Sequence, residues 1–240
     1  MSTTLPSIVT EVKTALETLA NPERLPFAAK VYPTNLKVLG LTVPDIQSVM
    51  KELKKETTHW PIEEKIDLAI AINEQGIFEM QHLALEYLGA DKKVLRALRP
   101  AHFTHLMQDF DNWVSVDVMG MKVLGMSWSY EQVDLDYILS LTKSKSLWIR
   151  RLALSATVGL NLPARGGKGD EKQTLAVCER LVHDTEEMVV KALSWALREL
   201  VKHKPDAVAE FIAKHEDHLA KRVLREVRQT LARPVKNKKA

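Results

Sequence analysis

Two groups of residues in this 240-residue chain combine tryptophan with charged side chains at helical spacing. Trp113 and Asp117 are four positions apart, which places an indole and a carboxylate on one face of a helix. Lys191, Trp195 and Arg198 show the same kind of spacing later in the chain. Indole faces attract cations, and a carboxylate stabilises positive charge that develops during a reaction. Tryptophans among cations, with one carboxylate, therefore indicate the lining of a binding groove, although a single tryptophan is more often part of a core.

The charge of the chain is distributed unevenly between its two halves. Residues 1–120 hold 12 Lys and Arg against 16 Asp and Glu, whereas residues 121–240 hold 22 against 15. A basic half is typical of a protein that meets a polyanion; the alternative is that it only improves solubility. The basic residues between the two tryptophan groups that could make such contacts include Lys143, Lys145, Arg150 and Arg151.

The elements that must position these residues are predicted to be helices. Apolar residues recur every three or four positions, as in Ile8, Val12 and Leu16, and the same spacing continues along most of the chain. Breakers such as Pro100 and Pro205 divide the chain into helices of roughly 10–16 residues. Nine glycines and ten prolines are few for a turn-rich β-sandwich, and no run is typical of a strand. We therefore expect an all-α fold.

Internal similarity predicts that these helices form repeated pairs. Four segments whose second residues are His82, Asp117, Arg151 and Lys191 can be superimposed, and these residues are 35, 34 and 40 positions apart. A period of this size is typical of an α-solenoid with HEAT-like or armadillo-like repeats. In such a stack the second helix of each pair lines a concave groove, so the four polar side chains would line it together. The alternative is chance similarity among amphipathic helices.

The sequence contains little that could hold a metal ion. Cys178 is the one cysteine, which excludes an intramolecular disulfide and a structural zinc site built on cysteines. The histidine pairs His102/His105 and His215/His218 lack the carboxylate arrangement of a zinc-protease motif. No metal is therefore expected.

Other features bear on the domain organisation and the location of the protein. No apolar run approaches the roughly 20 residues that span a bilayer, and the first 20 residues have no apolar core of the kind found in secretion signals. We expect no membrane association and a monomeric cytoplasmic protein. A single domain is expected over residues 1–232, followed by a basic, disordered tail over residues 233–240.

Three motifs, taken in order, resemble a known family. They are the Trp113–Asp117 segment, the Trp148–Arg151 segment, and Lys191-Ala-x-x-Trp195-x-Leu-Arg198-Glu199. Their order across the predicted repeats is similar to that in the AlkD-like family of alkylpurine DNA glycosylases. The stretch Lys37–Pro44 is also similar to that family's Phe-x-Gly-Val-Lys-x-Pro-like entry segment. The resemblance covers most of the chain, from about residue 30 to about residue 230.

The resemblance implies roles for individual residues. The family's catalytic aspartate falls on Asp117, and its two groove tryptophans fall on Trp113 and Trp195. Its DNA-contacting arginines fall on Arg151 and Arg198. The candidate catalytic group therefore consists of one carboxylate and two indoles.

Two positions depart from the family pattern. Val114 follows the first tryptophan, where the family can carry an acidic residue. Tyr32 matches a family aromatic only when one residue is gapped. Both departures bear on whether the family's activity is retained in this chain.

The activity that the resemblance implies is hydrolysis of the N-glycosidic bond of N3- or N7-alkylated purines in duplex DNA. Such a base already carries a positive charge, so Asp117 needs only to stabilise the oxocarbenium-like sugar and help orient a water. The indoles of Trp113 and Trp195 would attract the cationic lesion. The implied partner is double-stranded DNA with alkylated bases, and no cofactor is implied. Phosphate contacts are expected from Lys143, Lys145, Arg150, Arg151, Lys191 and Arg198.

Two other functions are open at this point. A non-catalytic HEAT-repeat protein could bind damaged or branched DNA, but binding alone gains little from a carboxylate such as Asp117 that faces phosphates. A protein-interaction scaffold is a common use of α-solenoids, and salt-dependent duplex binding would separate it from the other two. The glycosylase hypothesis places the protein in the cytoplasm, at the nucleoid if the source is bacterial.

Overall fold

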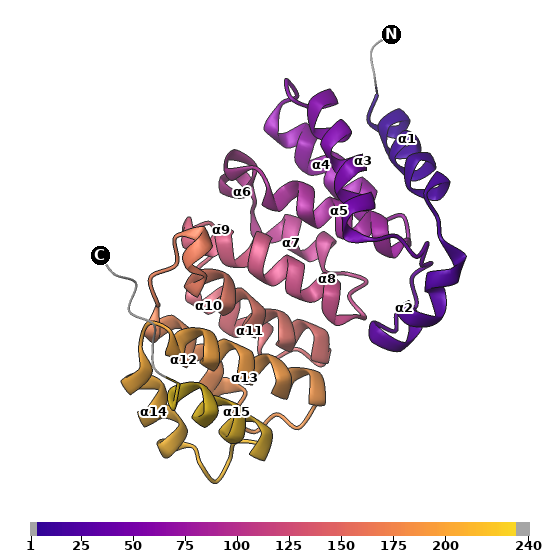
Figure 1. Ribbon diagram of the computed structural model, residues 1–240. Coiled ribbons are helices and arrows are strands. Elements are labelled where there is room, and N and C mark those ends of the chain that lie inside the picture. Colours follow the sequence, from indigo (N-terminus) through magenta and orange to yellow (C-terminus); the bar gives the residue numbers. More distant parts are fainter. Residues whose placement is uncertain (1–3, 234–240) are drawn as a thin grey trace. The chain divides into compact units, whose positions relative to one another are not determined.

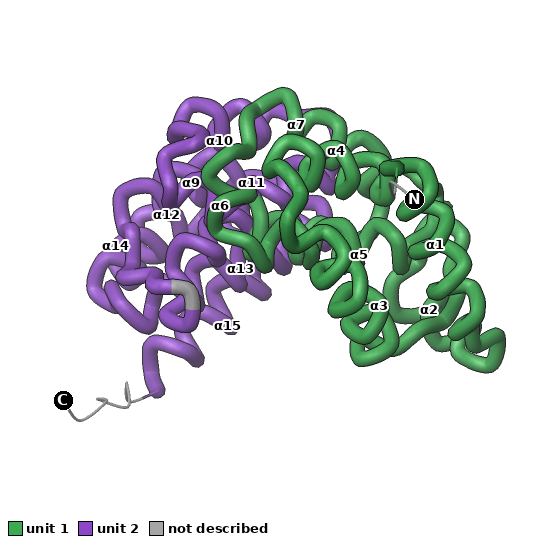
Figure 2. Tube along the Cα trace, turned by 90° about the horizontal axis from the view of Figure 1, so that it is seen from above, with its two compact units in different colours: residues 1–123 green, residues 124–240 purple. Residues whose placement is uncertain are grey.

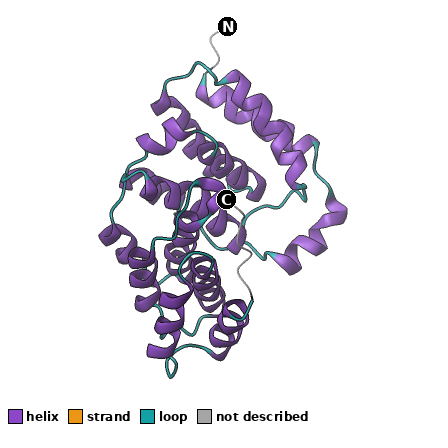
Figure 3. Ribbon diagram, turned by 60° about the vertical axis from the view of Figure 1, so that its left-hand side comes forward, coloured by secondary structure: helices purple, strands orange, loops and turns teal. Residues whose placement is uncertain are grey.

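The computed structural model describes residues 4–233, apart from the side chain of Arg165, and within this range the chain is helical without a strand (Figure 1, Figure 3). Lys37 and Ile77 form an isolated bridge. The all-α prediction is therefore confirmed. In the part of the chain that the structure describes, no helix has both the length and the apolarity that crossing a membrane requires. Residues 234–240, which hold most of the predicted tail, lie outside the described residues.

The chain divides into two compact units, residues 1–123 and residues 124–240 (Figure 2). Each unit has its own set of packed helices and its own buried side chains. The single domain expected over residues 1–232 stays a prediction.

Helix α5 is the centre of the first unit. It packs against α3, α4 and α8, and every residue from Phe78 to Leu85 is buried. Leu68 and Ile72 of α4 and Leu83 of α5 are fully buried, and each such side chain contributes about 1.5–3 kcal/mol of hydrophobic free energy. The helices of this unit are α1 Leu5–Thr18, α2 Leu25–Val31, α3 Val43–Glu56, α4 Ile62–Asn73, α5 Phe78–Gly89, α6 Lys92–Ala97, α7 Pro100–Leu106 and α8 Trp113–Val118, with a 3-10 turn at Pro22–Arg24.

The second unit shows a repeated pairing of helices. Helices α10, α12 and α14 are each followed by a helix that packs against it, and these second helices, α11, α13 and α15, contact one another in order (Figure 1). The helical-repeat prediction is therefore confirmed. A π-helix, Met119–Leu124, follows α8 in the chain; the elements after it are α9 Gly125–Ser129, α10 Leu135–Leu141, α11 Leu147–Asn161, a 3-10 turn Pro163–Arg165, α12 Glu171–Arg180, α13 Glu187–Val201, α14 Pro205–Lys214 and α15 Lys221–Leu231.

The four polar residues that align in the predicted repeats lie on four different helices, two in each unit. His82 is on α5, Asp117 on α8, Arg151 on α11 and Lys191 on α13. His82, Asp117 and Arg151 are between 6% and 7% exposed, so these side chains are largely enclosed. That all four line one groove stays a prediction.

Candidate nucleic-acid interface

Helix α8 holds the candidate catalytic pair of the first unit. The side chain of Asn112 accepts a hydrogen bond from the backbone N–H of Ser115 at 3.0 Å, which caps the helix so that it begins at Trp113. Asp117 lies one turn later and is 7% exposed, whereas Trp113 is half-buried. The indole and the carboxylate therefore share a helix face, as the spacing predicts. The π-helix that follows is of a type that is frequent at functional sites.

The start of α8 is fixed against the end of α2. The indole N–H of Trp113 donates to the backbone carbonyl of Val31 at 2.9 Å. Asp111, two residues earlier, accepts hydrogen bonds from the Thr34 hydroxyl at 2.6 Å and from the Asn35 backbone N–H at 2.5 Å. The bond to Val31 orients the indole, and the Asp111 bonds hold the residues just before α8 against the residues that follow α2. Sequence analysis missed Asp111, because its partners lie more than 70 positions away and no local pattern predicts them.

A row of rings lies between α2 and α5. Tyr32 stacks on Phe78 with ring centroids 4.6 Å apart, and the Phe78 ring is 6.4 Å from that of His82. Burial raises the pKa of Tyr32 and lowers the pKa of His82. Glu86, whose carboxylate is 3.7 Å from the His82 ring, opposes the second shift, and Lys122 adds to it. The His82 imidazole is therefore neutral near pH 7.

The entry segment Lys37–Pro44 has a structural role in the first unit. The buried carboxylate of Glu79 accepts hydrogen bonds from the backbone N–H groups of residues 39–41, at 2.9 to 3.2 Å. Gly40 has a φ of 80°, and a Cβ there would lie 2.3 Å from the backbone oxygen of Asn21. Glycine is therefore required at this turn. In this chain the segment forms a packed turn before α3.

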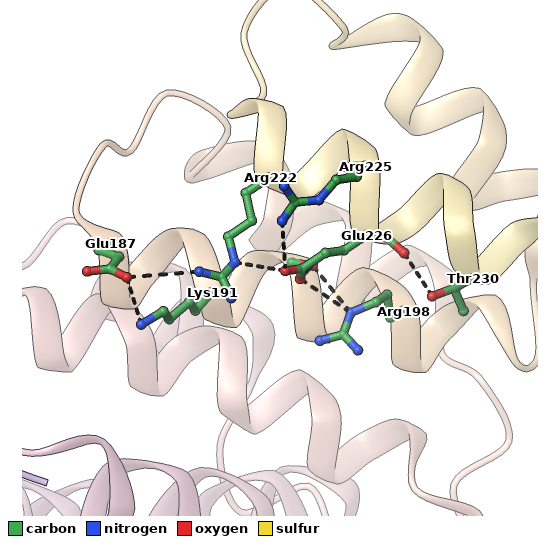
Figure 4. A network of polar contacts seen from close by, with 8 residues as sticks. Glu187, Lys191, Arg198, Arg222, Arg225, Glu226 and Thr230 are labelled. Carbon is green, nitrogen blue, oxygen red and sulfur yellow. Dashed lines mark hydrogen bonds and ion pairs between the residues drawn. The ribbon is translucent and has the colours of Figure 1, made fainter. Parts of the chain in front are cut away.

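Helix α13 holds the largest group of predicted residues in the second unit. Lys191, Trp195 and Arg198 are all half-buried and share one face of the helix. Lys191 forms an ion pair with Glu187 at 2.8 Å, and the Nε of Arg198 donates to the hydroxyl of Ser194 at 3.3 Å (Figure 4). The predicted clustering of a tryptophan with two cations is present on this helix.

The two arginines of α11 make contacts within the second unit. Arg151 is 6% exposed, and its Nη1 donates to the backbone carbonyl of Met188 at the start of α13 at 2.5 Å. Arg150 donates through Nε to Asp184 at 2.6 Å and through Nη1 to two carbonyls of the loop before α11. Both arginines therefore connect elements of the protein, a role that the sequence did not predict. The predicted cations that are exposed on the loop before α11 are Lys143 and Lys145.

The predicted residues thus form two separate groups. Trp113 and Asp117 belong to the first unit, and the other seven belong to the second. A common ligand for the two groups stays a prediction. An open depression of about 720 Å³ lies beside the glycine-rich loop of residues 166–169, and none of the nine predicted residues lines it. Among the described residues, no group of three or more His, Cys, Asp and Glu side chains could hold a metal ion.

Comparisons with known proteins agree with the motifs and with the fold. A family model described as DNA alkylation repair enzyme matches residues 12–231, a range that includes most of both units. The chain is also similar to a solved structure described as a predicted DNA alkylation repair enzyme from Enterococcus faecalis, at 22% identity and a TM-score of 0.72. The similarity covers 89% of this chain and 97% of that one, and at this identity it shows the fold alone. No curated protein sequence matches the chain.

Proposed function

The chain belongs to the DNA alkylation repair enzyme family, and we propose that its part in this repair is to excise N3- and N7-alkylated purines from duplex DNA. Water would attack the anomeric carbon of the sugar and the N-glycosidic bond would break. The products would be the neutral free base, an abasic site and the proton that the water loses to solvent. Family membership supports a role in alkylation repair. The observation that carries the choice of this reaction is the enclosed carboxylate of Asp117 one helical turn from Trp113.

The chemistry of the substrate matches the residues on α8. An alkylated purine with a formal positive charge leaves as a neutral base, so no acid is required to protonate it. Positive charge moves to the sugar as the bond breaks, and the carboxylate of Asp117 would stabilise that charge. At 7% exposure the carboxylate is little screened by water, which strengthens its electrostatic interaction with a group placed against it. The same carboxylate could orient the attacking water.

Trp113 would recognise the cationic lesion. Its N–H is bonded to the carbonyl of Val31, so the ring has a fixed orientation before the substrate arrives. A cation over an indole face contributes about 0.5–2 kcal/mol. Trp195 on α13 would make a second contact of this kind.

The second unit would supply most of the affinity for the duplex. Lys143 and Lys145 are exposed, and Lys191 and Arg198 are half-exposed on α13. Cations that neutralise phosphates give affinity that falls with added salt and does not depend on base sequence. Arg150 and Arg151 would act on this face indirectly, by fixing the loop before α11 and the start of α13.

The direct test is release of 7-methylguanine and 3-methyladenine from methylated duplex DNA, measured by chromatography of the free bases. The proposal expects release above spontaneous depurination, lost or strongly reduced in Asp117→Asn. Asp67→Asn is the matched control, because it makes the same change at an exposed position of α4 in the same unit. Salt-dependent duplex binding without release would favour the non-catalytic DNA-binding function, and absence of duplex binding would favour a protein scaffold.

A further inference from the structure

A carboxylate on α15 lies among arginines from two helices (Figure 4). Glu226 accepts a hydrogen bond from the hydroxyl of Ser194 on α13 at 2.6 Å and another from the Nε of Arg222 at 2.8 Å. The Nε of Arg198 is 3.9 Å and an Nη of Arg225 is 3.8 Å from the same carboxylate. We call Arg198, Arg222, Arg225 and Glu226 the α13/α15 cluster.

The α13/α15 cluster has more positive than negative charge. Three guanidinium groups surround one carboxylate, and the Glu226 side chain is 21% exposed while those of the arginines are 38% to 64% exposed. Burial would raise the pKa of Glu226, but the Ser194 hydroxyl and the arginines lower it overall, so the carboxylate is charged at neutral pH. The cluster therefore presents a cationic surface around a half-enclosed anion.

The orientation of the guanidinium groups indicates what this surface could bind. Arg198 and Arg222 both turn their Nε toward Glu226. Figure 4 shows the terminal nitrogens of Arg198 on the side away from Glu226, and the Nη1 of Arg222 is 3.9 Å from Glu187. The guanidinium of Arg198, held through Nε, keeps two terminal amino groups that can donate in parallel to two oxygens of one oxyanion. One terminal group of Arg222 already pairs with Glu187, so Arg222 would offer its other one. A phosphodiester group has two such oxygens.

We propose that Glu226 is a positioning residue that aims Arg198 and Arg222, with Arg225 beside them, at a phosphodiester group of a nucleic-acid backbone. The identity of the polyanion as duplex DNA rests on the proposed function. Arginines that are already ordered lose less side-chain entropy when the phosphate binds, so their ordering by Glu226 favours binding. Glu226 thus strengthens anion binding although it is itself an anion.

This role and simple charge neutralisation make opposite predictions for Glu226→Gln. The substitution keeps the size of the side chain and an oxygen that can accept from Ser194, while it raises the net charge of the protein by one. If Glu226 only neutralised arginines, the variant would bind duplex DNA more tightly. If Glu226 positions Arg198 and Arg222, the variant binds about 3- to 10-fold more weakly in spite of its added positive charge.

The experiment measures anisotropy of a short, fluorescein-labelled, undamaged duplex with the full chain over a series of salt concentrations. Arg222→Ala is expected to weaken binding about 3- to 10-fold and to reduce the salt slope by about one. Arg228→Ala is the matched control, because Arg228 is a 51% exposed arginine on the same helix that pairs with Glu216 instead. Equal or tighter binding by Glu226→Gln would overturn the proposal, as would equal effects of Arg222→Ala and Arg228→Ala.

Glu226→Asp provides a second variant with unchanged net charge. Its shorter side chain should lose the contact with Arg222 and weaken binding, whereas wild-type affinity in a variant with a wild-type melting temperature would count against positioning.

The outcome of these binding experiments is separate from that of the glycosylase proposal. Weaker binding by Glu226→Gln without any base release would support the α13/α15 cluster and contradict the activity, and base release with unaltered binding would do the reverse.

Discussion

Helix α8 of the first unit and helix α13 of the second hold their charged residues in different ways. On α8, Asp117 is largely enclosed, and its neighbour Trp113 is fixed by a hydrogen bond to a backbone carbonyl. On α13, Lys191 and Arg198 are half-exposed and lie near carboxylates. An enclosed charge acts strongly on a group placed against it, whereas exposed ion pairs contribute about 0–1 kcal/mol and are screened by salt.

This difference indicates a division of labour. A residue whose charge is protected from water is suited to stabilise a reacting group, and a face of exposed cations is suited to hold a polyanion in register. Under the proposed function, changes on α8 should therefore act on the rate of base release, and changes on α13 should act on the affinity for DNA. The predictions below test this separation.

The largest effect is expected for Asp117→Asn. The substitution is nearly isosteric and removes the charge, so the single-turnover rate should fall about 10- to 100-fold, somewhat below the loss typical of a removed oxyanion-hole donor. Affinity for undamaged duplex should stay the same or increase, because a negative charge is lost. Base release in samples quenched at set times measures the rate, and fluorescence anisotropy measures the affinity. A full rate in this variant would remove the only charged group assigned to the chemistry.

Arg150→Ala should mainly reduce stability. Its loss removes one of the hydrogen bonds to the enclosed carboxylate of Asp184, which keeps that from the backbone N–H of Glu186, and removes the donor to two loop carbonyls. The expected cost is about 1–3 kcal/mol in the free energy of unfolding. Urea denaturation would measure this cost. Lys143→Ala is the contrast, because this exposed residue should affect the salt dependence of DNA binding and leave unfolding unchanged. The reverse pattern would show that Arg150 contacts the phosphate backbone directly.

Trp113→Phe should have a smaller effect than Asp117→Asn. The variant keeps an aromatic ring but loses the hydrogen bond to Val31, and a bond of this kind contributes about 0.5–1.5 kcal/mol. Base release should slow by about 2- to 10-fold through looser placement of the ring. Trp113→Ala should weaken lesion recognition as well, since the cation–π contact is also lost. If both variants had the same rate and affinity, the indole N–H and the ring face would have no separate roles.

The smallest effect concerns the pH dependence of stability in the first unit. Burial lowers the pKa of His82 from 6.5 in the folded protein, with Glu86 opposing and Lys122 adding to the shift. The stability that the neutral imidazole provides is therefore complete above about pH 6.5 and is lost as the pH falls toward the lower, folded pKa. His82→Gln should flatten this loss in unfolding titrations between about pH 7 and pH 5. His215 is a buried histidine of the second unit, and burial also lowers its pKa. His215→Gln should therefore flatten the loss of stability at low pH in the same way.

Sequence analysis predicted the helical repeats because apolar periodicity and proline positions are local signals. It also placed Trp113 with Asp117, and Lys191 with Trp195 and Arg198, because residues three or four apart on a helix share a face. It did not predict which acceptors Arg150 and Arg151 contact, since Asp184 and Met188 lie more than 30 positions away. The arginines of α15 were missed for a related reason. Their significance depends on Glu226, Ser194 and Arg198, which only the packing of α13 against α15 brings together.

Single-turnover base release at increasing enzyme concentration, with Asp117→Asn and Arg198→Ala on the same methylated duplex, tests the central claim most directly. The account predicts that Asp117→Asn has a plateau rate reduced about 10- to 100-fold, with an unchanged or lower half-saturating concentration. Arg198→Ala should need about 3- to 10-fold more enzyme but reach the wild-type plateau. Two results would contradict the division between a reacting helix and a binding helix. One is a wild-type plateau rate in Asp117→Asn, and the other is a plateau rate of Arg198→Ala that stays below wild type at saturating enzyme.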